Sequence, residues 1–290
     1  MPKFGFFNPK TCTLIGMGIN IALTVFKLLA GILGFSKAMV ADALHSLSDI
    51  LTSVIVYIGI CIGERPADED HPYGHGNAET IAAGLVSFII LIIGAFAGIS
   101  AILAIIHRQF RAPLMIALLA AIVSIIIKEG LFRYTISVGK KSNNPAVIAD
   151  AWHHRSDVYS SIATLIGIAG ARISFLYLDP LAGIIVSGFI VKIAFKIIRS
   201  NIEIIMDEKP SSVFINNIKA IVQKTEGVRN IDSIKAHRRG STFTIDLEIA
   251  VDGNLSVEQG HRIASDVRAK LFKQAPNIRD VMVHVNPVRD

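Results

Sequence analysis

Two copies of one motif govern how this chain is interpreted. The first is VADALHSLSDI, residues 40–50, and the second is IADAWHHRSDV, residues 148–158. Both contain the pattern Ala-Asp-Ala-x-His-x-x-Ser-Asp, and both lie inside long apolar segments. A helix advances about 100° per residue, so residues spaced three and four apart share one face. In the first copy these residues are Asp42, His45 and Asp49, and in the second they are Asp150, His153 and Asp157.

Ionisable side chains inside a membrane-spanning helix are costly, and they usually mark a functional site. The alternative is that they are ordinary polar positions packed between helices, but a repeated His-x-x-x-Asp spacing favours function. Four side chains would form a tetrahedral shell of two nitrogens and two oxygens: His45, Asp49, His153 and Asp157. Such a shell suits Zn²⁺, although Fe²⁺, Co²⁺ and Mn²⁺ accept the same ligand types.

The first aspartate of each copy precedes the histidine by one helical turn. Asp42 and Asp150 therefore have two possible roles. They can orient an imidazole through a hydrogen bond, or they can bind the metal themselves.

The composition favours an integral membrane protein with a soluble appendage. The chain has 290 residues, of which 52% are hydrophobic and 18% are charged. Its net charge of +6 resides largely at the ends of apolar segments, which indicates orientation in a lipid bilayer and no nucleic-acid partner. The two cysteines, Cys12 and Cys61, are too few for a disulfide framework.

Crossing a bilayer takes about 20 mostly apolar residues. Six segments qualify: Thr11 to Phe35, Lys37 to Gly63, Ala78 to Ile106, Pro113 to Val138, Pro145 to Ala171 and Leu178 to Ile198. The distribution of basic residues places both termini in the cytoplasm. We interpret Met1 to Lys10 as a retained cytoplasmic start, since no small-residue cleavage site follows a short apolar core.

Other charges also fall within these segments. Lys27, Lys128 with Glu129, and Lys192 can either line a path or pair between helices and reach the interface. Glu129 and Arg133 are four residues apart, so we expect them to pair on one helical face.

The segment from Glu64 to Glu79 is predicted to be a polar cytoplasmic loop. Asp68, His71 and His75 lie within eight residues and combine carboxylate and imidazole ligands. Alone, this cluster would fit a solvated loop equally well. Beside an intramembrane site, it becomes a second candidate metal position.

The composition changes after Asp207, which divides the chain into a six-span domain of residues 1–207 and a cytoplasmic domain of residues 208–290. The pattern of the second domain predicts an αββαβ order: helix 211–225, strands 228–236 and 242–251, helix 256–273 and strand 280–285. Ser256 and Gln259 fit a capping box. A domain this small would gain stability by pairing with a second copy.

The cytoplasmic domain contains further candidate metal ligands. They are Asp246, His261 and His284, with Asp232 as a weaker one. Their spacing does not require them to converge, so surface or structural roles remain equally open.

Together these features resemble the cation diffusion facilitator family of divalent-metal transporters. The resemblance rests on six spans, the paired motifs, Pro-Ala-Asp-x-x-His-x-x-Gly-His-Gly after the second span, and a C-terminal domain ending in Val-His-Val-Asn-Pro. It implies a helical membrane bundle with a small ferredoxin-like, metallochaperone-like α+β domain. It also implies a homodimer in the inner membrane, in which the paired motifs transport metal and Asp246, His261 and His284 form a regulatory site.

By this resemblance we expect a Zn²⁺/H⁺ antiporter that exports metal from the cytoplasm by alternating access, with Fe²⁺, Mn²⁺, Co²⁺ or Cd²⁺ as alternative cargo. No enzymatic activity is expected. The rival from another class is a membrane metalloenzyme, which needs an open coordination position and a bound water. A metal sensor that uses only the cytoplasmic domain would leave the repeated motif without a role.

Overall fold

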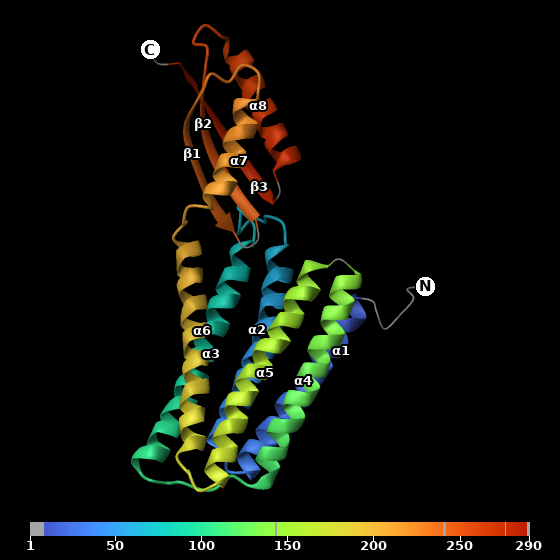
Figure 1. Cartoon of the computed structure of the whole chain (residues 1–290). Coiled ribbons are helices and arrows are strands. Elements are labelled where there is room, and N and C mark those ends of the chain that lie inside the picture. Colours follow the sequence, from blue (N-terminus) through green and yellow to red (C-terminus); the bar gives the residue numbers. More distant parts are fainter. Residues whose placement is uncertain (1–8, 143, 240–241, 276, 289–290) are drawn as a thin grey trace. The chain divides into compact units, whose positions relative to one another are not determined.

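A computed structural model describes residues 9–142, 144–239, 242–275 and 277–288, which fold into eight helices and three strands (Figure 1). The chain divides into two compact units. The first comprises residues 1–55 and 85–197, and the second comprises residues 56–84 and 198–290. Of the predicted cytoplasmic start, residues 1–8 lie outside the described residues.

Six long helices run alongside one another (Figure 1). They are α1 (Pro9–Leu33), α2 (Lys37–Gly63), α3 (Asn77–Ile106), α4 (Met115–Lys141), α5 (Pro145–Arg172) and α6 (Leu178–Ile205). All six segments predicted to span the membrane are therefore helical. The ends differ most in α6, which continues seven residues beyond the predicted Ile198 because the Arg199–Glu203 pair at 2.9 Å supports another turn after the apolar run ends.

The first unit has polar side chains inside and large apolar side chains outside. Lys27, Asp42 and Lys128 are buried, whereas Phe96 and Ile126 are exposed. A water-soluble domain has the opposite arrangement. The outer surface of this unit therefore suits lipid, and its interior suits charged cargo.

Small residues bring the helices of this unit close together. Ala30, Ala117, Ala120 and Ala121 are all buried between helices. A Cβ added to Gly34 would lie 2.8 Å from the Ala117 Cβ, so the glycine is needed for this approach. Close packing through small residues is characteristic of membrane helices.

Five of the described helices are long and apolar enough to cross a membrane: α1, α2, α3, α4 and α6. The exception is α5, although it has 28 residues. Its first half contains the second motif copy, with Asp150, Arg155 and Asp157 close together, which lowers its apolar character. The helix was predicted correctly, and its polarity reflects the motif.

The second unit contains a three-stranded sheet with two helices on one face (Figure 1). Its elements are α7 (Ser212–Gln223), β1 (Asn230–Arg239), β2 (Thr242–Val251), α8 (Val257–Gln274) and β3 (Ile278–Pro287). The central β2 pairs antiparallel with β1 and parallel with β3. The αββαβ order is as predicted, and β3 is two residues longer at each end because it pairs with β2 along its length.

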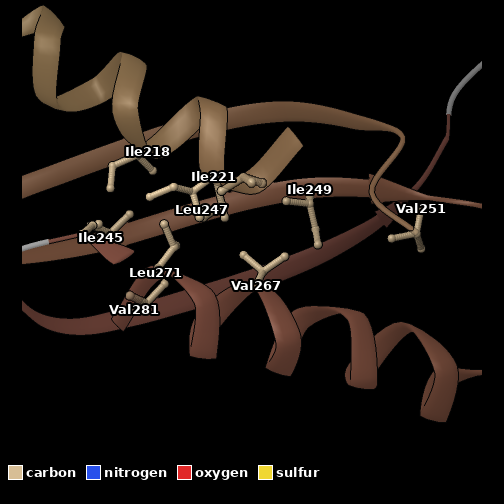
Figure 2. Close-up of a cluster of buried hydrophobic side chains, with 11 residues drawn as sticks. Ile218, Ile221, Ile245, Leu247, Ile249, Val251, Val267, Leu271 and Val281 are labelled. Carbon is tan, nitrogen blue, oxygen red and sulfur yellow. The ribbon is translucent and has the colours of Figure 1, made fainter. Parts of the chain in front are cut away.

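The core of this unit lies between the sheet and the two helices. Figure 2 shows Ile218 of α7 and Leu271 of α8 near Leu247 of β2, and Val267 of α8 near Ile249; all five belong to one buried cluster. The predicted capping box of α8 is confirmed: Gln259 N donates to Ser256 Oγ at 3.2 Å, and Ser256 N donates to Gln259 Oε1 at 2.8 Å. Strand alternation and helix capping therefore determined this fold.

Replacing Leu271 with alanine tests this core. Leu271 is 0% exposed, so Leu271→Ala leaves a cavity and should lower the free energy of unfolding by about 2–5 kcal/mol. The measurement is urea unfolding of a fragment of residues 208–290, the predicted cytoplasmic domain. Phe272→Ala is the control, because Phe272 is 42% exposed and should change stability far less. Equal losses in the two variants would contradict the assignment of the core.

Candidate metal sites

The two motif copies face each other across α2 and α5. Asp42 on α2 accepts a hydrogen bond from Ser161 on α5 at 2.9 Å, and Asp49 Oδ2 lies 3.7 Å from His153 Nε2. Since residue numbers rise along α2 while those of the partners fall along α5, the helices run antiparallel. This arrangement places the two motif copies opposite each other, with Asp49 beside His153.

The four predicted transport ligands come together at this crossing. One ligand atom each of His45, Asp49 and Asp157 lies within 4.8 Å of the others. The fourth ligand, His153, contacts Asp49 at the distance given above. The cluster, which we call the tetrad, thus offers two imidazoles and two carboxylates from two helices. Its donor set fits a tetrahedral divalent cation.

A buried lysine, Lys128, forms an ion pair with Asp157 of the tetrad. Lys128 Nζ on α4 donates to Asp157 Oδ2 at 2.6 Å, and both side chains are buried. The other oxygen of this carboxylate, Oδ1, has no hydrogen-bond partner. A metal ion that uses Asp157 fully must therefore displace the lysine ammonium. Sequence reasoning allowed Lys128 either to line a path or to pair, and it pairs with a predicted metal ligand.

A second lysine neutralises the first aspartate of the other motif copy. Lys27 Nζ on α1 lies 2.8 Å from Asp42 Oδ2 and 3.1 Å from Ser161 Oγ. Ser160 and Ser161 also donate to the two Asp42 oxygens at 3.2 and 2.9 Å. Asp42 is thus fully engaged, which favours a structural role over metal binding. We call these four residues the Lys27 network.

Two further charged sites named from the sequence lie outside these buried clusters. Glu129 and Arg133 form the expected pair at 2.9 Å. Lys192 is exposed. These residues do not contribute to the buried clusters.

A cavity of about 180 Å³ adjoins the tetrad between α1, α2 and α5. Asp49 and His153 of the tetrad line it, together with Asn20, Asp150 and His154. Asp150 is therefore not equivalent in environment to Asp42: it lies at an open cavity, with its Oδ2 3.6 Å from His154 Nε2.

The predicted loop ligands also form a cluster. Ligand atoms of Asp68, His71 and His75 lie within 4.8 Å of one another, and the two imidazole rings are 4.5 Å apart. The His71 backbone N–H donates to Asp68 Oδ1 at 2.7 Å, which is the main reason that the pKa of Asp68 lies below its usual value. Gly74, with φ of +75°, makes the turn that brings His75 back.

The four candidates of the cytoplasmic domain do not form such a cluster within the described residues. Asp246 and His284 are exposed on neighbouring strands of the uncovered sheet face, but their registered partners are Met282 and Glu248. His261 is on α8. Asp232 accepts hydrogen bonds from Asn230 at 3.2 Å and Asn286 at 3.1 Å.

The apolar helical exterior and the imidazole–carboxylate cluster between α2 and α5 define a membrane protein suited to handling metal cations. Residues 13–206 match the family model of the cation efflux transmembrane domain, and residues 210–288 match that of the cation efflux protein cytoplasmic domain. The chain belongs to the cation diffusion facilitator family and is a divalent metal cation efflux transporter.

Individual relatives extend along nearly the whole chain. The manganese efflux system protein MneP of Bacillus subtilis is 36% identical over 285 residues, covering 96% of each chain. The magnetosome protein MamB of Paramagnetospirillum magneticum is 32% identical over 268 residues, covering 92% of this chain and 90% of MamB. A solved structure, MamM-CTD 215-293, covers 26% of this chain and 96% of its own, with 26% identity and a TM-score of 0.26.

Replacing Lys128 tests its competition with metal. Lys128→Met leaves the buried Asp157 carboxylate without its partner, which should cost about 3–5 kcal/mol of stability. A bound divalent cation would restore much of that loss. The increase in melting temperature on adding metal to the detergent-solubilised chain should therefore be larger in this variant than in the parent.

The control is Lys192→Met, which removes an exposed lysine and should keep the parental response to metal. An equal metal-induced increase in Lys128→Met and the parent would show that Lys128 and the cation do not share Asp157.

Proposed function

We propose that this protein exports a divalent cation from the cytoplasm in exchange for protons, by alternating access at the tetrad. The observation that carries the proposal is the meeting of imidazole and carboxylate ligands from α2 and α5. Two carboxylates cancel the charge of one divalent cation, and four protein ligands fill a tetrahedral shell.

The position of the cavity relative to the Lys27 network supports alternating access. The cavity is lined by the first part of α1, including Thr13 and Asn20, and by the first part of α5, including Asp150. Lys27, Asp42 and Ser161 of the Lys27 network are buried, and Lys27 and Ser161 lie farther along α1 and α5. We therefore infer that metal reaches the tetrad from the ends where α1 and α5 begin, which we call the open end.

The basic residues assign the open end to the cytoplasm, with both termini on that side. In this orientation the cavity loads cytoplasmic metal. Release on the far side then requires the Lys27–Asp42 contact to separate while the cavity closes. For a bacterial-type cell, the corresponding location is the inner membrane.

Proton coupling follows from the ligand chemistry. Imidazole binds either a proton or a metal at a given nitrogen, so metal affinity falls as protons arrive. An inward proton gradient would therefore drive metal off the tetrad on the far side.

The identity of the cargo has two candidates. Two imidazoles with two carboxylates suit Zn²⁺, which we propose as the cargo. Mn²⁺ is the second candidate, because a relative with 36% identity is named for manganese efflux and because the cavity adds oxygen donors from Asn20 and Asp150.

We further propose that residues 208–290 form a cytoplasmic domain that joins two copies into a homodimer. In this arrangement Asp246, His261 and His284, with Asp232, bind regulatory metal, and ligands from two copies complete the site. The separation of these residues within one chain supports the need for a second copy. The loop cluster of Asp68, His71 and His75 would bind metal at the cytoplasmic surface.

A membrane metalloenzyme remains the rival. It requires a metal with an open coordination position and a nearby general base. Transport is favoured because His45, Asp49 and Asp157 converge and His153 lies beside Asp49, so protein side chains can supply all four ligands of a tetrahedral shell.

Replacing Asp49 distinguishes these functions. In proteoliposomes, Asp49→Asn should reduce metal uptake at least tenfold, because one of the two compensating charges is lost. The isolated loop and cytoplasmic positions should still bind metal in this variant. Tyr57→Phe, an exposed position two turns farther along α2, is the control and should transport normally. Normal flux in Asp49→Asn would exclude the tetrad as the transport site.

The pH gradient and the cargo can be tested in the same vesicles. An imposed gradient should change the rate of Zn²⁺ uptake, and uptake should move protons in the opposite direction. Uptake that is insensitive to the gradient would reject antiport. A lower half-saturating concentration for Mn²⁺ than for Zn²⁺ would assign the cargo to manganese.

A further inference from the structure

His154 is a buried imidazole that the tetrad does not use. Its side chain is almost fully buried, and neither Nδ1 nor Nε2 has a hydrogen-bond partner. The nearest charged atom is Asp150 Oδ2, 3.6 Å from Nε2. Buried polar groups are nearly always satisfied, so an imidazole whose two nitrogens have no protein partner is suited to bind a ligand.

A second atom that could bind a metal and has no protein partner lies on α1, the helix that His154 faces. Asn20 Oδ1 on α1 is buried and has no partner, and Asn20 lines the same 180 Å³ cavity as His154 and Asp150. A Cβ added to Gly16 would lie 3.6 Å from His154 Nε2, so the ring points toward α1. One nitrogen and two oxygen donors from two helices therefore surround one cavity, which has room for an ion with some of its water.

The charges of the four motif aspartates are unequally compensated. Asp42 pairs with Lys27, and Asp157 pairs with Lys128. Among the described residues, no lysine or arginine forms a salt bridge with Asp49 or Asp150. These two carboxylates line the cavity together with Lys128, and their contacts within 4 Å are the imidazoles of His153 and His154, so the carboxylate charges in the cavity favour a cation.

The position of these donors orders them relative to the tetrad. Asp150 precedes His153 by three residues, so it lies about 4.5 Å nearer the open end of α5 at the usual helical rise. His154 faces α1, whereas its neighbour His153 faces Asp49 on α2. An ion that enters from the end where α5 begins meets Asp150 first, and His154 lies between His153 and Asp157 along α5, on the side that faces α1.

We propose that His154, Asp150 and Asn20 form a holding site for the divalent cation, which is occupied before the tetrad. The cation binds His154 through one ring nitrogen and Asp150 and Asn20 through oxygen, and it retains water. Lys128 stays on Asp157 at this stage, and the cation displaces it only on moving to the tetrad. This inference rests on the proposed transport function, because it concerns the same cargo and the same cavity.

The test measures the number of Mn²⁺ ions bound per chain and does not require transport activity. Mn²⁺ is titrated into the detergent-solubilised full chain that carries His45→Ala and His153→Ala, and free Mn²⁺ is measured by electron paramagnetic resonance. These substitutions remove both tetrad imidazoles but keep the Lys128–Asp157 pair. Adding His154→Leu should lower the number of bound ions by one per chain, and Asn20→Leu should weaken the same ion about tenfold.

Met17→Leu is the matched control, since Met17 lines the cavity without a nitrogen or oxygen donor, and it should leave the ion count unchanged. His154→Gln guards against misfolding, because it keeps a polar side chain of similar size; it should also remove the His154 share of the nitrogen coupling, while the Mn²⁺ ions bound by other histidines keep theirs. An unchanged ion count in both His154 variants would overturn the holding site. Failure of the transport proposal is recognised separately, by normal flux in Asp49→Asn.

Discussion

Charge buried between these helices must be neutralised within the protein, because neither lipid nor a closely packed interior solvates a carboxylate. Four aspartates occupy equivalent places in the two motif copies, and the structure neutralises two of them with lysines. Lys27 is committed to Asp42 and Lys128 to Asp157. The remaining two, Asp49 and Asp150, line a cavity that Lys128 also lines, and we propose that a divalent cation binds there.

Because only two of the four aspartates pair with lysines, the two sides of the tetrad have different environments. The Lys27 network ties α1 to α2 and α5 and closes one side of the tetrad. On the other side, the cavity lacks such a network and remains accessible. A chemically repeated motif thus produces two different environments, one sealed by a lysine and serines and the other available to metal. Transport by alternating access requires these environments to exchange.

The sequence predicted the helices, the αββαβ order and the motif residues, because these depend on local apolar periodicity, capping and spacing. The meeting of ligands from α2 and α5 was also expected, because the His-x-x-x-Asp spacing occurs in both. The sequence did not reveal which aspartate each lysine joins. Lys128 and Asp157 are 29 residues apart on different helices, so their pairing depends on how α4 packs on α5. His154 was hidden beside His153 for the same reason, because only helix rotation decides that it faces α1.

The second unit shows another limit of sequence reasoning. The core of Ile218, Leu247 and Leu271 follows from alternation and helical periodicity. The candidate ligands Asp246 and His284 were identified by residue type alone, and strand register pairs each with another residue. The regulatory site that we propose draws its ligands from two chains, and such a site leaves no spacing signal within one chain.

The central claim is that α2 and α5 bind one cation between them. The most direct measurement is anomalous scattering from crystals of the full chain grown with Zn²⁺ or Mn²⁺. We predict a peak within bonding distance, about 2.0–2.2 Å, of ligand atoms from both Asp49 and Asp157. A peak bound by only one of these helices, or none in the bundle while the loop cluster is filled, would contradict the account.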